Sequence, residues 1–374
     1  MLTEFDEFPI HQTPEPLAFN STGDRNAYER CWFNGFATDG SYFFGLTMGY
    51  YPNRGIIDGA FSVYRNGALQ RCVHISARSQ LHGKTVAGPL RIDFVEPMRR
   101  VHVTLDDNGS GLGCDMTFST RSAAVLENRQ ILRSGPRRTM DATRYDQFGR
   151  WEGTITTPEG VIQVADQCCY GIKDRSWGVR RFGEAEPVGP IKGHRPLFLW
   201  TPIFWDDHVS HAIIFDDELG HALFREGFEA PLYPSTEAVP GIEDGKVRHM
   251  RAVDHRVQYT QGTRYAKAAE IDLVSVTGQS RTISLEPILR FQQKGIGYGH
   301  SKWPHGVWRG DLSIEHESFD PQMLDPLALD NIHVQHVVRA RDDSGRTGIG
   351  ILEEFILGAY APSGFEDLLE KSRT

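Results

Sequence analysis

The chain has 374 residues, of which 39% are hydrophobic and 24% are charged, and its formal net charge is −9 at pH 7. This length and composition predict a globular protein of two domains with a normal hydrophobic core, and they exclude a disordered chain. The net negative charge, without any long run of Lys or Arg, argues against nucleic acid as a partner.

Cysteine content and hydropathy bear on location. Five cysteines, an odd number in a long chain, favour reduced thiols and therefore a cytoplasmic protein. The first residues, MLTEFDEFPIHQTPEP, lack the basic and then apolar pattern of a signal peptide. No window approaches 18 consecutive apolar residues, so no integral membrane segment is expected.

The first predicted elements are a short helix and a pair of strands. Residues 21–32, STGDRNAYERCW, predict one or two helical turns. Residues 43–65 predict two strands joined by a turn at PNRG, because Pro52 forces an extended conformation on Tyr51. A Tyr phenol in an apolar pocket can donate a proton, so Tyr51 is a candidate acid, and an aromatic wall residue is the alternative.

Alternation of apolar and polar residues around turn signals predicts a series of β-hairpins. In residues 99–120, Val101, Val103 and Leu105 share one face ahead of the turn DDNGSG. The same pattern recurs in four later segments: 151–164, 211–228, 269–288 and 334–355. Apart from a capping box at 363–372, helical signals are scarce, so we expect a mainly β protein built from antiparallel barrels or sandwiches.

The segment CCYGIKDRSWGVRRFG, residues 168–183, places five charged side chains and one Trp within nine positions. Asp174 in this segment is either neutralised by a neighbouring cation or part of a site. The stretch 180–196 that follows is rich in Gly, Pro and charge. It predicts a boundary between a domain at 1–190 and a domain at 191–374.

A second dense segment is KGIGYGHSKWPHGVWRGDL, residues 294–312. Its glycines suggest bulges or a close approach of the backbone to a ligand. Its aromatic and imidazole side chains are Tyr298, His300, Trp303, His305 and Trp308. The histidines suit general acid–base chemistry, metal ligation together with His333 and His336, or simple hydrogen-bonded packing.

Glu353 and Glu354 are adjacent in the apolar strand GILEEFILG, so they must point to opposite faces. A buried carboxylate there is either paired, for example with Arg180, or part of a site. Glu354 is the candidate for substrate contact. No GxGxxG, Walker A, HExxH or GxSxG motif is present, so neither an organic cofactor nor a metal is expected.

DRSWGVR, together with the preceding WEGTITTPEG hairpin, resembles a signature of the lipocalin-like proteins related to carotenoid 1,2-hydratase, hydroxyneurosporene synthase, AttH and tocopherol cyclase. YPNRGIIDG, GYGHSKWPHGVWRG and GILEEFILG resemble blocks of a bacterial branch of that superfamily. The resemblance implies two consecutive lipocalin-like β domains with ligands bound in or between them. It also implies proton transfer on apolar ligands without an organic cofactor. The motif Asp of the hydratases corresponds to Asp174, whereas Arg175 stands where His is common, which disfavours a carotenoid substrate.

The resulting hypothesis is a cofactor-independent lyase, hydratase or isomerase that acts on a hydrophobic aromatic or isoprenoid-like small molecule. Elimination from a lignin-derived aromatic dimer is one concrete version. Asp174, His305 or Tyr51 would transfer the proton, and Arg180 would stabilise anionic charge. The substrate would contact a set of six side chains: Trp177, Trp200, Tyr298, His300, Trp303 and Glu354.

Two alternatives remain open at this point. A pair of lipocalin-like domains can carry a hydrophobic ligand without converting it. A metal-dependent enzyme that uses His300, His305 and a carboxylate is the other. If the protein is a cofactor-independent enzyme or a carrier, its expected partner is a hydrophobic small molecule. The sequence leaves open whether the chain forms a homodimer.

Overall fold

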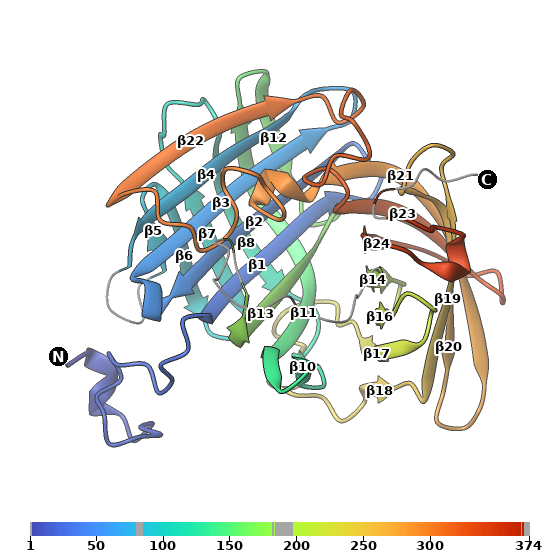
Figure 1. Ribbon diagram of the computed structural model, residues 1–374, viewed down its shortest axis with the longest axis horizontal. Coiled ribbons are helices and arrows are strands. Elements are labelled where there is room, and N and C mark those ends of the chain that lie inside the picture. Colours follow the sequence, from blue (N-terminus) through green and yellow to red (C-terminus); the bar gives the residue numbers. More distant parts are fainter. Residues whose placement is uncertain (1, 80–84, 182, 184–196, 368, 370–374) are drawn as a thin grey trace.

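In the computed structural model, the described residues are 2–79, 85–181, 183, 197–367 and 369. Antiparallel strands dominate this part of the chain and form two curled sheets, which confirms the predicted mainly β class (Figure 1). Within the described residues, no helix is long and apolar enough to cross a membrane. The helical elements of the described part of the chain are four 3-10 turns: η1 (Glu4–Glu7), η2 (Pro52–Arg54), η3 (Gln293–Ile296) and η4 (Ala361–Ser363).

The first sheet is built mostly from the first half of the chain, and its order along the main path is β22-β4-β3-β2-β1-β13-β11-β8-β7-β6-β5. Three further strands, β9, β10 and β12, pair with the long strand β11. The strands are β1 (Ala27–Ala37), β2 (Tyr42–Tyr51), β3 (Ile56–Arg65), β4 (Gln70–Arg78), β5 (Val86–Ala87), β6 (Leu90–Glu96), β7 (Arg100–Leu105), β8 (Gly113–Thr120), β9 (Val125–Leu126), β10 (Gln130–Ser134), β11 (Arg137–Thr157), β12 (Gly160–Val164), β13 (Cys169–Arg180) and β22 (Leu312–Phe319).

The second sheet comes from the second half of the chain and has the order β18-β17-β16-β14-β24-β23-β21-β20-β19, with β15 bridging β16 and β24. The strands are β14 (Leu197–Trp200), β15 (Ile203–Phe204), β16 (His208–Asp216), β17 (Ala222–Pro231), β18 (Arg248–His249), β19 (Ala252–Tyr259), β20 (Ala266–Val274), β21 (Ser280–Gln292), β23 (Val334–Asp342) and β24 (Thr347–Ile356). The boundary predicted between residues 190 and 191 lies outside the described residues.

The second half of the chain also contributes a strand to the first sheet. β22 pairs antiparallel with β4, with Leu312 opposite Ala77 and Phe319 opposite Gln70. In Figure 1, β22 lies along the outer edge of the first sheet, far from the other late strands. The two halves of the chain are therefore joined by strand pairing as well as by side-chain packing.

The predicted hairpins are present, but the predicted N-terminal helix is wrong. The five alternating segments form the pairs β7–β8, β11–β12, β16–β17, β20–β21 and β23–β24. Residues 27–32 instead open strand β1, which pairs with both β2 and β13. These two ladders satisfy the backbone on both sides and override a weak local helical preference. In the described part of 363–372, only Ser363 belongs to a helical turn, at the end of η4.

Of the four apolar clusters among the described residues, the three largest hold the two sheets together. One fills the first sheet around Phe33, Phe44 and Trp151, and a second fills the other sheet around Ile271 and Leu285. The third lies between the sheets and takes side chains from both, with Phe43 and Phe291 ring centroids 4.4 Å apart. The same inter-sheet layer contains the cavity described next.

Candidate active site between the two sheets

A cavity of about 1020 Å³ opens between the two sheets. Its walls combine aromatic rings with charged groups from both halves of the chain. The aromatic part is formed by Trp32, Phe198, Trp200, Phe215, Tyr298 and Phe355. A space of this size suits a small organic ligand, and its apolar walls would exclude water around a few polar groups.

Strand β13, which carries the dense charged motif, forms part of the cavity wall. It lies between β1 and β11, so that Asp174 is opposite Trp32 on one side and Asp146 on the other. Because side chains alternate along a strand, Asp174 faces the cavity, whereas Lys173 and Arg175 lie on the opposite face, where Lys173 donates a hydrogen bond to Gln147 and Arg175 pairs with Glu29. The crowding of charge in the sequence is thus divided between two faces.

Asp174 is held against a buried arginine on the neighbouring strand. Its Oδ2 lies 3.0 Å from Nε of Arg144, and both side chains are largely buried. Burial raises the pKa of the Asp174 carboxyl, whereas the positive charge of Arg144 lowers it. The carboxyl is therefore under two opposing influences, burial and the adjacent cation.

A second carboxyl, Glu353 on β24, lines the cavity from the other sheet. Its Oε1 is 2.6 Å from Nε2 of His333, and its Oε2 accepts a hydrogen bond of 2.6 Å from Gln335. Gln335 in turn accepts a bond of 3.1 Å from Nδ2 of Asn34 on β1. This chain fixes the orientation of Glu353 and connects the two sheets below the cavity.

Tyr298 links the cavity to a buried polar group behind it. Arg30 donates to the Tyr298 hydroxyl at 3.3 Å and to the Tyr51 hydroxyl at 2.8 Å. Burial raises the pKa of Tyr51 above its usual range, with Arg30 opposing the shift. His305 packs edge-on against Tyr298 and lies 2.6 Å, through Nε2, from the backbone carbonyl of Ile296. Burial holds the pKa of His305 well below its usual range, so the ring is neutral and Nε2 donates this bond.

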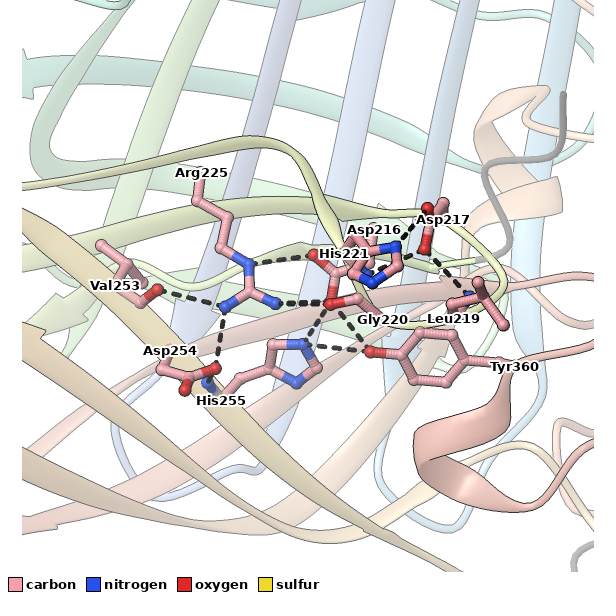
Figure 2. Close-up of polar contacts among 10 residues, drawn as sticks. All are labelled: Asp216, Asp217, Leu219, Gly220, His221, Arg225, Val253, Asp254, His255 and Tyr360. Carbon is pink, nitrogen blue, oxygen red and sulfur yellow. Dashed lines mark hydrogen bonds and ion pairs between the residues drawn. The ribbon is translucent and has the colours of Figure 1, made fainter.

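One rim of the cavity is a turn held by carboxylates (Figure 2). Asp217 accepts hydrogen bonds from the backbone amides of Leu219 and His221, at 2.9 and 2.8 Å. The adjacent Asp216 accepts two bonds of 2.9 Å from Arg225. Asp216 also lies 2.9 Å from His255 and accepts a 2.9 Å bond from the Tyr360 hydroxyl. Figure 2 shows these groups converging below the turn that carries Asp217, which fixes its position at the rim.

The residues predicted from the sequence fall into three places. Asp174, Arg180, Trp200 and Tyr298 line the cavity. Tyr51 and His305 lie behind Tyr298, as described above. The remaining four lie elsewhere: Trp177 is 40% exposed on the other face of β13, His300 is near Glu317, Trp303 stacks on His74, and Glu354 contacts His336.

Sequence reasoning missed the opposing members of the site. Arg144, Glu353 and His333 line the cavity. Sequence reasoning considered Glu353 as a buried carboxylate and His333 as a metal ligand without choosing either as a site residue, and it did not consider Arg144 at all. The alternation rule separated Glu353 from Glu354, yet it could not say which of them faces the cavity. One sequence feature could have indicated Arg144: it lies two residues before Asp146 in a strand. This spacing places a cation and an acid on the same face of the strand.

The histidines considered as metal ligands are each paired with a different group. His300 lies 3.2 Å from Glu317, and His336 lies 2.8 Å from Glu354. Among the described residues, the group whose ligand atoms converge is Glu127, Asp146 and His211, directly behind Arg144.

Comparison with known proteins identifies one family and a shared fold. The model of DUF8625, a family of unknown function, matches residues 2–366. No curated protein matches the sequence. A solved structure from Nitrosomonas europaea described as an AttH has a TM-score of 0.56 and 12% identity, covering 93% of this chain and 98% of that one. Kievitone hydratase from Nectria haematococca has a TM-score of 0.52 and 11% identity, covering 87% and 88%. These likenesses show that the chain shares the fold of those two structures.

Proposed function

Because the chain belongs to the DUF8625 family, whose function is unknown, we propose an activity from its cavity: a hydratase, lyase or isomerase that moves protons on a hydrophobic small molecule without an organic cofactor. The observation that carries this proposal is the pair of carboxyls, Asp174 and Glu353, that face one aromatic cavity from opposite sheets. The hydratase name of one structure that shares the fold agrees with it.

The two carboxyls have different surroundings, which suits them to different roles. Asp174, whose pKa is raised by burial, acts as the acid and donates a proton to one carbon of a double bond. Water adds to the other carbon and loses its proton to the Glu353–His333 pair. Arg144 then stabilises the Asp174 carboxylate. The reverse sequence eliminates water, and proton exchange with solvent restores both groups.

The walls define the substrate class. Phe198 and Phe215 stack with ring centroids 4.8 Å apart, and Trp32 meets Trp200 edge-on at 5.6 Å. Flat apolar rings favour an aromatic or isoprenoid-like ligand, and a lignin-derived aromatic dimer is one molecule of this class. Arg180, which also lines the cavity, would balance an oxyanion that develops on such a ligand.

The first test is Asp174→Asn, which keeps the shape of the side chain but removes its ionisable proton. Ligands are found by thermal shift with a panel of unsaturated aromatic compounds, and turnover is followed by mass spectrometry in D₂O. We expect D174N to bind as the wild type does and to lose deuterium incorporation by about 10²-fold or more. Asp115→Asn, at an exposed position on β8, should change neither quantity.

Two outcomes would contradict the proposal. Unchanged turnover in D174N would remove Asp174 as the acid. A wild-type protein that binds members of the panel, yet never incorporates deuterium or converts them, would instead be a carrier of hydrophobic ligands.

A further inference from the structure

Behind the cavity wall, three metal-binding side chains from both sheets converge. Asp146 lies on β11, His211 lies on β16, and Glu127 follows β9. One ligand atom from each lies within 4.8 Å of the other two, and Nε2 of His211 is 3.7 Å from Oδ2 of Asp146. Ligands of a tetrahedral Zn²⁺ are about 3.3 Å apart, so a small contraction would close this set around an ion.

All three side chains are buried, and polar atoms that lack a hydrogen-bond partner among the described residues lie between them. Asp146 is 0% exposed, and among the described residues its carboxylate oxygens receive no hydrogen bond from an amide, hydroxyl or cationic group; the polar group in contact with them is the carboxyl of Glu127. His211, at 1% exposure, contacts the backbone of Thr201, and its Nε2, which faces Asp146, has no hydrogen-bond partner among the described residues; Oε1 of Glu127 has none in that part of the chain either. Buried polar atoms are nearly always satisfied, so several orphans around one point indicate a group that completes them.

The side chains around Glu127 and His211 resemble those that surround the ligands of known metal sites. Oε2 of Glu127 accepts a hydrogen bond of 3.1 Å from Gln130 and lies 3.5 Å from Nη1 of Arg144, which leaves Oε1 for an ion. His211 is enclosed by the rings of Trp200 and Phe228, with centroids 5.0 and 4.8 Å away. Partners of this kind orient ligands and exclude water at metal sites.

The charges around Arg144 also favour a bound cation. Glu127, Asp146 and Asp174 surround the single guanidinium of Arg144. Arg30 and Arg180 also act on Asp174, so among the described residues Glu127 and Asp146 are the two carboxyls of this group whose charge Arg144 alone offsets, and a bound cation would neutralise the remaining negative charge. Burial of like charges without compensation is too costly to persist.

We propose that Glu127, Asp146 and His211 bind a divalent first-row transition ion, represented by Zn²⁺, at the junction of the two sheets. Two carboxylates and one imidazole are suitable ligands for such an ion. The ion lies behind Arg144 rather than in the cavity, and it ties β11 to β16. This inference does not depend on the proposed reaction.

The test measures metal content and metal-dependent stability of the full chain, purified without a polyhistidine tag. We expect one Zn²⁺ per chain by elemental analysis after loading with ZnCl₂ and desalting. For chelator-treated protein, a hundredfold excess of Zn²⁺ over its Kd should raise the unfolding midpoint by about 3 °C. MgCl₂ at the same concentration should have little effect, because Mg²⁺ prefers oxygen ligands and keeps its waters.

Variants locate the site. His211→Phe fits the surrounding aromatic rings, and Asp146→Asn keeps the side-chain shape. Both should retain the wild-type circular dichroism but bind almost no Zn²⁺. Glu226→Gln is the matched control, because Glu226 is a buried carboxyl near Glu127 that is already hydrogen-bonded to Asn128, and it should bind Zn²⁺ normally.

A wild-type protein that takes up no Zn²⁺ and shows no Zn²⁺-dependent rise in its unfolding midpoint would overturn the proposal. Glu127 and Asp146 would then share a proton, and D146N would unfold at the same temperature as the wild type or higher. Equal Zn²⁺ binding by wild type, D146N and H211F would overturn it as well, because the ion would then bind elsewhere. If both variants fail to fold, the wild-type measurements with and without chelator still decide the question.

Discussion

Lys173 neighbours the carboxyl of the site in sequence but lies in a different environment. It is 2% exposed, and Nζ donates a hydrogen bond of 2.9 Å to Gln147. The ammonium also lies 5.3 Å from the centroid of the Tyr145 ring. Burial lowers the pKa of Lys173 to about 8, because these contacts replace only part of its hydration.

This shift makes stability depend on pH. A lysine whose pKa is about 8 when folded and 10.5 when unfolded binds fewer protons in the folded chain between those values, so stability rises with pH there. We expect the unfolding free energy of the wild type, relative to Lys173→Met, to increase by about 3 kcal/mol from pH 8 to pH 10.5. Urea denaturation of both proteins at several pH values measures it. A difference that stays constant with pH would show that Lys173 is not perturbed.

At the scale of the elements, close packing of β11 against β13 depends on a glycine. The indole of Trp151 on β11 donates a hydrogen bond of 2.8 Å to the carbonyl of Asn34, and its ring covers Gly171 on β13. A Cβ at Gly171 would lie 2.3 Å from both Cδ1 and Nε1 of Trp151. No side chain fits there without displacing the indole.

Gly171→Ala should therefore destabilise the protein by about 2 kcal/mol, because it displaces the indole and strains its hydrogen bond. Denaturant unfolding followed by far-UV circular dichroism gives the value. Gly245→Ala is the control, since no atom lies within 4 Å of a Cβ at that position, and it should change stability by less than about 0.5 kcal/mol. Equal stability of G171A and G245A would contradict the packing argument.

At the scale of the elements, the sequence predicted pairings between neighbouring segments of the chain. Alternation and turn residues determine hairpins such as β7–β8, because neighbouring segments pair with little loss of chain entropy. Pairings between distant segments, such as β22 with β4, leave no comparable local pattern. For the same reason Asp174 could be chosen from its motif, whereas the opposing Glu353 could not be distinguished from Glu354. The face of β24 that meets the cavity is set by packing against the other sheet.

At the scale of the whole molecule, the two halves of the chain are joined by strand pairing and by a common apolar layer. β22 adds a strand from the second half of the chain to the first sheet, and the third apolar cluster draws rings from both. The amide of Gln70 donates a buried hydrogen bond of 2.8 Å to the carbonyl of Gln292, which adds a polar tie. Separation of the sheets would expose this whole layer at once.

We therefore expect the protein to unfold in a single cooperative transition. Differential scanning calorimetry should give one peak whose calorimetric and van't Hoff enthalpies agree. Two resolved peaks, or an enthalpy ratio well above unity, would mean that the sheets unfold independently.

The cavity takes its floor and its rim from different kinds of structure. Asp174, Arg144 and Glu353 lie on long paired strands, whereas Asp217 lies in the turn between β16 and β17 at the rim. Turns tolerate insertion and exchange far better than central strands do. A new turn grafted between β16 and β17 can therefore change which ligands enter the cavity while the strand residues of its floor stay in place.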